Sequence, residues 1–292
     1  MMHHAASPIL ITGGTGMLAQ AFAHQLGLAG KTVALLGRAE LNVADDASVA
    51  SAIDRHRPAV IINCAAYTKV DHCEKDPQAA FAVNQTGPAI LARHAKRLGI
   101  RLVHFSTDYV FDGTVRRPLL TTDPLGPASA YGKSKLAGEQ AIQAEMSDGF
   151  LILRTAWLYG PGGPNFVATM VNAARAKKNL KVVCDQIGSP TYTRDLADAT
   201  LALLESDAAG IFHAANAGQT NWFEFTRHIL KAFEIDYPVS PITTADWFAM
   251  KPDSAIRPAY SVLDTSSLTS ASGYAFRPWQ EALAEYRTLN AV

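Results

Sequence analysis

The sequence predicts an α/β protein whose first half forms a doubly wound parallel sheet and whose second half adds a smaller α/β unit. Apolar stretches of strand length alternate there with Ala- and Leu-rich stretches of helical periodicity. Continuous apolar strands alternating with helices are what a parallel sheet covered on both faces requires, and the right-handed crossover rule favours the doubly wound topology. The expected strands are residues 9–12, 32–36, 60–63, 101–106 and 151–155, and the expected helices are residues 18–28, 47–55, 77–98 and 131–145.

The pattern changes after Trp157. A Gly- and Pro-rich turn signal covers residues 159–164, and short strand-like pieces then separate the remaining helical patterns. We therefore expect a first domain over residues 8–165, joined again by a segment near 194–206, and a second domain mainly over residues 166–292. The later helical patterns are residues 165–176, 194–204, 221–233 and 278–289.

Composition excludes several classes of protein. The 292 residues include 26 basic and 26 acidic side chains, which balance, and 48% are hydrophobic, so neither a disordered chain nor a nucleic-acid binder acting through bulk charge is expected. No apolar run reaches the roughly 18–20 residues that span a membrane, and residues 1–7 form a loose end without the layout of a signal peptide. The three cysteines lack metal-ligand spacing, which indicates reduced thiols in a cytoplasmic protein; they are Cys64, Cys73 and Cys184.

A glycine-rich loop follows the first predicted strand and opens the first predicted helix. It reads Gly-x-x-Gly-x-x-Ala from Gly13 to Ala19. Glycines let a backbone turn tightly and approach a pyrophosphate, whose charge is stabilised by the N-terminus of a helix. Between a first strand and a first helix this pattern predicts a Rossmann-type dinucleotide site, although a purely structural turn is the alternative. The candidate contacts are Gly13, Thr15, Gly16, Met17 and Leu18.

The end of the second predicted strand bears on which dinucleotide binds. An acidic residue there would accept hydrogen bonds from a free adenosine ribose and favour NAD. This sequence has Gly37 and then Arg38, whose guanidinium suits a 2′-phosphate. We therefore expect NADPH as the cofactor, with NADH possible; a solvated surface arginine is the alternative.

Three side chains form a candidate catalytic set. Tyr131 and Lys135 are four residues apart and share one face of a predicted helix, while Thr107 lies at the carboxyl end of a predicted strand. An ammonium beside a phenol is expected to lower the pKa of the phenol from about 10. Such a tyrosine can exchange a proton with a carbonyl or alcohol oxygen, to which the threonine can also hydrogen-bond.

These motifs resemble the extended short-chain dehydrogenase/reductase superfamily and, more closely, the dTDP-4-dehydrorhamnose reductase family. The resemblance runs from about residue 9 to residue 279 and includes the runs STDYVFDG at residues 106–113 and YGKSKLAGE at residues 131–139. The other matching motifs are residues 13–19, 63–66, 66–71, 154–160, 165–166, 185–191 and 257–258.

The resemblance implies NADPH-dependent reduction of the 4-keto group of dTDP-4-dehydro-L-rhamnose to dTDP-L-rhamnose, with Tyr131 as proton donor. It implies that Thr107, Tyr131 and Lys135 are the catalytic triad, that the first domain binds NADP and that the second binds mainly the substrate. Further cofactor contacts would be Cys64, Ala65, Ala66, Tyr67 and Asn84, together with Tyr131 and Lys135 of the triad. Contacts to the nucleotide-sugar substrate would be Thr68, Val70, Thr107, Asp108, Tyr109, Trp157, Asn165 and Arg257.

Two of those substrate contacts have plainer alternatives. Trp157 could equally be a core aromatic residue if the resemblance is set aside. Arg257 would pair with the diphosphate of the substrate, but by itself a surface arginine more often forms an ion pair with a neighbouring carboxylate.

The sequence departs from the family at a metal site. Members that bind magnesium at a dimer interface use carboxylates near the start of the first helix and after the Gly-x-Pro-Thr turn. Those places hold Ala21 and Arg194 here, with Asp195 next to the arginine. Magnesium requires oxygen ligands, so no metal is expected, and the protein should be a monomer or a metal-independent homodimer.

Other functions remain open on the same fold. A nucleotide-sugar 4,6-dehydratase would carry an Asp-Glu pair after the threonine, whereas Asp108 is followed here by Tyr109. A nucleotide-sugar epimerase of the superfamily stays possible, as does a non-catalytic NADP-binding regulatory subunit of the methionine adenosyltransferase type. Neither nucleic acid nor membrane is expected as a partner.

Overall fold

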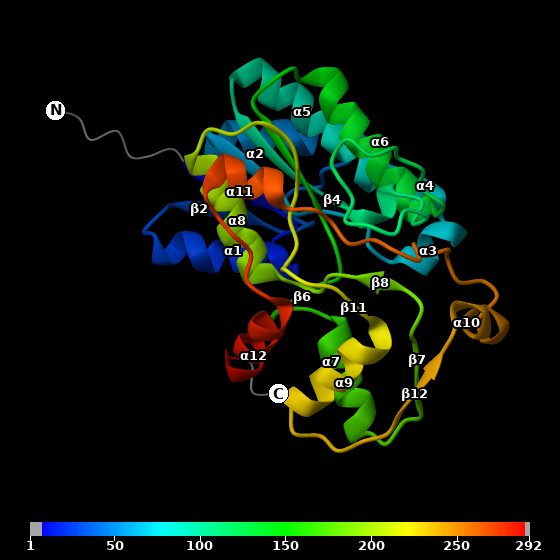
Figure 1. Cartoon of the computed structure of the whole chain (residues 1–292). Helices are drawn as coiled ribbons and strands as arrows, with labels where there is room; N and C mark the ends of the chain where they lie inside the picture. Colours follow the sequence, from blue (N-terminus) through cyan, green and yellow to red (C-terminus); the bar gives the residue numbers. More distant parts are fainter. Residues whose placement is uncertain (1–7, 290–292) are drawn as a thin grey trace.

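The computed structural model describes residues 8–289 and is built around a six-stranded parallel sheet (Figure 1). The strand order is β10-β5-β4-β3-β1-β2. The order reverses between β1 and β3, which is where open α/β sheets bind ligands. All five predicted strands are confirmed, and β10 is a sixth that was not predicted. The strands are β1 (Ile9–Thr12), β2 (Val33–Leu36), β3 (Val60–Asn63), β4 (Arg101–Thr107), β5 (Phe150–Thr155) and β10 (Gly210–His213).

Helices cover both faces of the sheet, as the alternating pattern predicts. Successive strand residues point to opposite faces, so Ile11 packs under α1 and α8 while Leu10 packs under α2 and α5. One layer consists of α1 (Met17–Leu28), α8 (Thr193–Glu205) and α11 (Ser266–Ser272), and the other of α2 (Asp46–His56), α5 (Gly87–Leu98) and α6 (Ala130–Glu145).

The predicted helix over residues 77–98 is divided into three parts. The α-helix α4 (Pro77–Phe81) leads into the π-helical turn η1 (Ala82–Thr86), and α5 follows. Pro88 has no amide hydrogen to donate to the carbonyl of Asn84 four residues earlier, so the regular α-helical ladder is interrupted there. Gly138 of α6 packs against the same carbonyl, because a Cβ at residue 138 would lie only 2.1 Å from that oxygen.

A second group of helices lies beside the sheet (Figure 1). Its core is aromatic and includes Tyr159, Phe225 and Trp279. It is formed by α7 (Phe166–Arg175), α9 (Trp222–Ala232) and α12 (Trp279–Leu289), with the strand pairs β7 (Leu180–Val183) and β12 (Val239–Ile242), β6 (Leu158–Tyr159) and β9 (Thr191–Tyr192), and β8 (Ile187–Gly188) and β11 (Thr220–Asn221). The remaining short elements are α3 (Val70–Lys75), η2 (Asp108–Val110) and α10 (Thr244–Met250).

The second half of the chain returns to the sheet more than once. The segment expected near residues 194–206 is α8, which packs against α1, and β10 then extends the sheet beside β5. We propose the division into two domains near residue 165. Because β10 pairs with β5 and α11 packs on α8, these two elements belong to the first domain together with α8.

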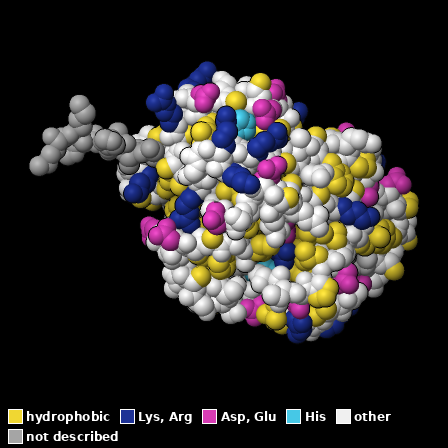
Figure 2. Space-filling view, turned by 90° about the horizontal axis from the view of Figure 1, so that it is seen from above, with side chains coloured by type: hydrophobic (Ala, Val, Ile, Leu, Met, Phe, Trp, Pro, Cys, Tyr) yellow, Lys and Arg dark blue, Asp and Glu magenta, His cyan; other side chains and the backbone are white. Residues whose placement is uncertain are grey.

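The surface is mixed in charge. Figure 2 shows Lys and Arg side chains interspersed with Asp and Glu on one face, in keeping with the zero net charge of the chain. Within residues 8–289, no helix combines the length and apolar character that crossing a bilayer would take.

Candidate active site

A cavity of about 670 Å³ opens at the carboxyl ends of the central strands. Its walls are formed by the start of α1, the segments after β2, β3, β4 and β5, and α6. The sites that the sequence predicts for the cofactor, for catalysis and for much of the substrate therefore meet in one cavity at the switch point of the sheet.

The glycine-rich loop forms the floor of this cavity at the start of α1. Gly13 has φ +66°, and a Cβ at that position would lie 2.8 Å from the amide nitrogen of Ala65, so only glycine fits between the two loops. Gly16 precedes α1 without a side-chain cap, which leaves the first amide groups of the helix available to an anion. All five predicted loop contacts line the cavity: Gly13, Thr15, Gly16, Met17 and Leu18.

The wall beyond the loop contains five more of the predicted cofactor contacts. Arg38 follows β2, is exposed and lines the cavity. The segment after β3 lines it as well, through Cys64, Ala65, Ala66 and Tyr67.

The three candidate catalytic side chains come from two neighbouring elements. Thr107 ends β4, where its hydroxyl donates to Asp108 Oδ1 at 3.0 Å and accepts from the amide of Tyr109 at 3.2 Å. Tyr131 and Lys135 project from the first turns of α6, and the ring of Tyr109 lies edge-on to that of Tyr131 with centroids 5.5 Å apart. Thr107, Tyr131 and Lys135 all line the cavity.

The acidity of Tyr131 differs from the expectation. Burial raises the pKa of the phenol above its usual range, against a smaller opposing effect from a hydrogen bond with Thr107. The pKa of the phenol is thus raised, where the sequence predicted that it is lowered, because the effect of burial is the largest. Lys135 Nζ lies 3.2 Å from His104 Nε2, and burial lowers the pKa of the lysine to about 8.

Asp108 is a second buried acid beside the catalytic set. It is 2% exposed, and burial raises its pKa to about 6 despite hydrogen bonds from Ser261 and Thr107. A carboxyl group of this kind changes its protonation state close to neutral pH.

Aromatic side chains form part of the cavity wall. Of the residues expected to contact the substrate, Thr68, Val70, Asp108, Tyr109 and Trp157 line the cavity, together with Thr107. Trp222 also lines it, because its ring stacks on that of Trp157 with centroids 3.5 Å apart and 9° between the planes.

Sequence reasoning did not find Trp222. It lies on the same helical stripe as the buried Phe225 and Ile229, so its spacing looks like that of a core residue. No signal in the sequence separates it from the core. Other lining residues that were not predicted are Ala19, Leu41, Asn42, Val43, Val83, Phe105, Ser106, Thr155, Ala156, Leu158, Gly162, Gly163, Pro164 and Thr193.

Three predicted site residues do not line the cavity. The buried amide of Asn84 accepts from the amide of Tyr67 at 2.8 Å and donates to Ser134 Oγ at 3.0 Å, which ties the segment after β3 to α6. Asn165 caps α7 and donates to the carbonyl of Gly160 at 2.8 Å.

Arg257 is the third of these residues. It forms an ion pair with Asp71 at 2.9 Å, which is the plainer alternative that the sequence left open for it.

The positions that correspond to the magnesium-binding carboxylates of the family make other contacts in this structure. Ala21 is buried on α1, Arg194 pairs with Glu285 at 3.1 Å, and Asp195 pairs with Arg277 at 2.7 Å. Between residues 8 and 289, no group of three or more His, Cys, Asp and Glu side chains is placed to hold a metal ion.

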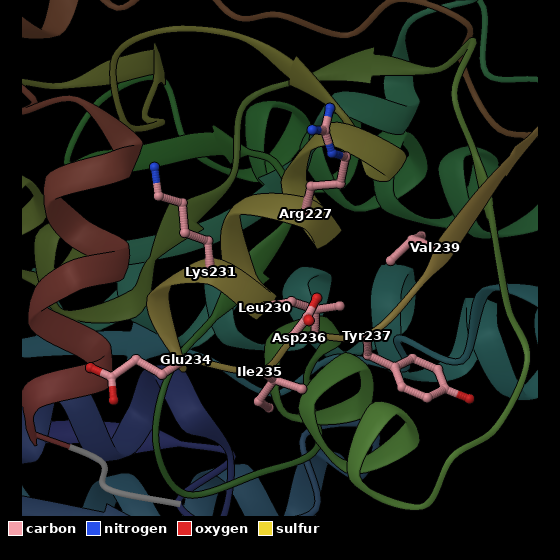
Figure 3. Close-up of a pocket in the computed structure, with 8 residues that line it drawn as sticks. All are labelled: Arg227, Leu230, Lys231, Glu234, Ile235, Asp236, Tyr237 and Val239. Atoms are coloured by element: carbon pink, nitrogen blue, oxygen red, sulfur yellow. The ribbon is translucent and has the colours of Figure 1, made fainter.

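A second hollow of about 460 Å³ lies at the end of α9 (Figure 3). The side chains of Arg227, Lys231 and Glu234 point in different directions around it. It lacks converging polar groups, and we do not consider it a candidate active site.

The fold and the cavity define the class of protein: a Rossmann-type oxidoreductase that depends on a nicotinamide dinucleotide. A family model described as RmlD substrate binding domain matches residues 7–290, and the chain belongs to this family.

Relatives of the chain are similar along nearly its whole length. A dTDP-4-dehydrorhamnose reductase of Streptomyces griseus is 43% identical, with 94% of this chain and 91% of the relative covered. The crystal structure of a dTDP-4-dehydrorhamnose reductase from Clostridium acetobutylicum is 39% identical with a TM-score of 0.92, covering 98% of this chain and 100% of that one. One from Bacillus anthracis, in complex with NADP, is 33% identical with a TM-score of 0.90, covering 98% and 99%.

Proposed function

We propose that the protein reduces the 4-keto group of dTDP-4-dehydro-L-rhamnose with NADPH and that Tyr131 donates the proton. The observation that carries this proposal is the meeting of the glycine-rich loop, Arg38 and the catalytic set in one cavity. Membership of the family and the names of the similar reductases support the choice of substrate.

The residues of the cavity fit a phosphorylated dinucleotide. The uncapped start of α1 and the close approach of Gly13 to Ala65 suit a pyrophosphate. Arg38 is free to reach a 2′-phosphate because its side chain is exposed at the rim. When bound, NADPH supplies the hydride for the reduction.

The side chains of the chain provide the proton and stabilise the developing charge. Thr107 and Tyr131 hydrogen-bond to the carbonyl oxygen of the sugar, and Tyr131 passes its proton to that oxygen as negative charge develops. The raised pKa of the phenol keeps it protonated at neutral pH, which a proton donor requires. Lys135 lies one helical turn from Tyr131 and supports it electrostatically.

The two alternative functions differ in what they do with the cofactor. An epimerase retains NAD and returns the hydride to the sugar, whereas Arg38 favours NADP, which exchanges. A regulatory subunit needs no reaction, whereas Thr107, Tyr131 and Lys135 all face one cavity here.

Turnover with NADPH and dTDP-4-dehydro-L-rhamnose tests the proposal. We expect one NADPH to be oxidised for each sugar reduced, with the C4 configuration of the product read by NMR. Interconversion of C4 epimers without consumption of NADPH would identify an epimerase. NADPH binding without turnover would favour the regulatory alternative.

A further inference from the structure

Two carboxylates of the short helix α3 hold two distant parts of the chain. The backbone amide of Ala130, at the start of α6, donates to Glu74 Oε1 at 2.8 Å. The backbone amide of Ala255 donates to Asp71 Oδ1 at 3.0 Å, and the guanidinium of Arg257 donates to the same carboxylate at 2.9 and 3.1 Å. Helix α3 therefore joins the start of the helix that carries the catalytic tyrosine to the segment around Arg257.

The first turn of α6 depends on side chains for its hydrogen bonds. The first amides of an α-helix have no acceptor within the helix. The hydroxyl of Ser129 accepts from the amide of Gly132 at 3.1 Å, and Glu74 provides the acceptor for the amide of Ala130. A carboxylate near the start of a helix is also stabilised by the helix dipole. Tyr131 lies between the two bonded amides, so these two side chains together fix the turn from which its phenol projects.

The same turn packs closely against α3 and η2. A Cβ at residue 132 would lie 2.3 Å from the carbonyl oxygen of Tyr109, so α6 contacts η2 at a position where only glycine fits. Tyr131 packs against a small cluster that includes Cys73 of α3 and Ala130 of α6. Closely packed interiors transmit displacements from one element to the next. A shift of α3 would therefore move the phenol.

We propose that Glu74 is a positioning residue for Tyr131: its carboxylate holds the amide of Ala130 and thereby keeps the phenol within reach of the carbonyl oxygen of the sugar. Asp71 anchors α3 to the segment around Arg257, so Glu74 acts from a fixed support. This inference rests on the function proposed above, in which Tyr131 donates the proton. Proton transfer requires hydrogen-bond distance between donor and acceptor, and a misplacement of about 1 Å can cost about 10²-fold in rate.

The segment to which Asp71 anchors α3 is itself connected to the site. Ser261, a few residues after Arg257, hydrogen-bonds to the buried carboxyl of Asp108 in the cavity wall. The charges of Asp71 and Arg257 both act on the phenol of Tyr109, which also lines the cavity. The anchor of α3 is therefore attached to the same wall that contains the catalytic set.

Hydrogen exchange of single backbone amides, followed by NMR on the full chain, tests the contact without turnover. In the unaltered protein the Ala130 amide should be protected; exchange at the rate of an unprotected amide would overturn the proposal, whether or not any variant folds. In Glu74→Ala this amide should exchange at least about tenfold faster, because it loses a charge-assisted hydrogen bond. The Gly132 amide, held by Ser129, is the internal control and should change little. An unchanged exchange rate of the Ala130 amide in Glu74→Ala would also overturn the proposal.

Kinetics separate positioning from a purely structural part. Glu74→Ala should lower kcat at least about tenfold, with little change in the KM of the nucleotide sugar or in the Kd of NADPH. Glu74→Gln keeps an acceptor oxygen for the amide of Ala130 and should recover most of the loss. Glu145→Ala, the same substitution at the other end of α6, is the matched control and should leave kcat unchanged. A normal kcat in Glu74→Ala, or equal kcat values in the Ala and Gln variants, would overturn the proposal.

A double variant tests whether Asp71 acts through the same helix. Asp71→Ala should lower kcat less than Glu74→Ala does, since it loosens the anchor but leaves the bond to Ala130. Because both changes act on α3, the double variant should lose little more than Glu74→Ala alone. Losses that multiply would show separate effects and overturn the anchoring role of Asp71. If the unaltered protein were inactive on the keto-sugar, the proposed function would fail, whereas exchange of the Ala130 amide would still decide whether Glu74 holds α6.

Discussion

Trp157 and Trp222 stack face to face in the wall of the cavity, although they are 65 residues apart in the chain. Trp157 has a left-handed backbone conformation with φ +47°. A non-glycine residue adopts that conformation at a cost, which is offset only where the surrounding packing holds it. The packing of the two rings therefore stabilises this conformation of Trp157 in the cavity wall.

Removing Trp222 should weaken substrate binding selectively. One aromatic contact contributes about 0.5–1.5 kcal/mol beyond the area it buries. Loss of such a contact between Trp222 and the nucleotide sugar in Trp222→Ala should raise the KM roughly 2- to 12-fold. The Kd of NADPH should change little. Phe223→Ala, next to it on α9 but outside the cavity, is the control. The same change in KM in both variants would contradict a contact between Trp222 and the nucleotide sugar.

Tyr131→Phe should abolish most of the turnover and leave NADPH binding nearly intact. General acid catalysis contributes about 10²–10⁴-fold, and the pyrophosphate loop does not involve the phenol. Steady-state kcat and a fluorescence titration with NADPH measure the two effects. Tyr260→Phe, which removes a hydroxyl bonded to Gln219 outside the cavity, should behave like the unaltered protein. Near-normal kcat in a folded Tyr131→Phe variant would remove Tyr131 as proton donor.

Arg38→Ala should weaken NADPH more than NADH, because only NADPH carries the 2′-phosphate. A charge-assisted hydrogen bond contributes about 1.5–3 kcal/mol, which corresponds to at least about a tenfold change in preference. Titration with both cofactors checks this, with Arg55→Ala, an exposed arginine on α2, as control. An equal loss for NADPH and NADH would show that the guanidinium does not contact the phosphate.

Asp108→Asn should stabilise the protein at neutral pH but not in acid. Burial raises the pKa of Asp108 from 3.8 to about 6, so the folded state favours the protonated carboxyl and loses stability as pH rises through this window. The cost above about pH 6 is at most about 3 kcal/mol, since one pKa unit corresponds to about 1.4 kcal/mol.

Thermal unfolding from about pH 4 to about pH 7 measures this effect. The advantage of the Asn variant should grow as pH rises. Asp148→Asn, at an exposed site, should show no such trend. A difference in Tm that stays constant with pH would contradict the raised pKa of the buried Asp108 carboxyl.

Activity and assembly should not respond to magnesium. The ion pairs of Arg194 with Glu285 and of Asp195 with Arg277 occupy the carboxylates nearest to the matched site. We expect equal turnover and equal sedimentation with magnesium or with a strong chelator. Arg194→Glu places an extra carboxylate beside Glu285 and is the variant in which a metal response could appear. A metal-dependent mass together with lost turnover in the unaltered protein would show that the ligands were misplaced.

Local patterns predicted the regular parts of the fold well. Strands such as β3 are short apolar runs between polar segments, and α6 begins directly after Ser129, whose hydroxyl accepts from the amide of Gly132 at 3.1 Å. The helical pattern over residues 77–98 is continuous in the sequence, so the π-turn within it was not predicted. That turn depends on the missing amide hydrogen of Pro88 and on the close packing of α6.

The sequence by itself determined the alternation of strands and helices, the glycine-rich loop and the Tyr131–Lys135 spacing, because each depends on residues close together in the chain. Only the tertiary structure decided that Trp222 stacks on Trp157, that Arg257 pairs with Asp71 and that Lys135 meets His104. Those contacts join residues 31 to 186 positions apart. Such distant side chains meet only when the register of the sheet and the packing of its helices bring them together, and the same burial sets the pKa values of Tyr131 and Lys135.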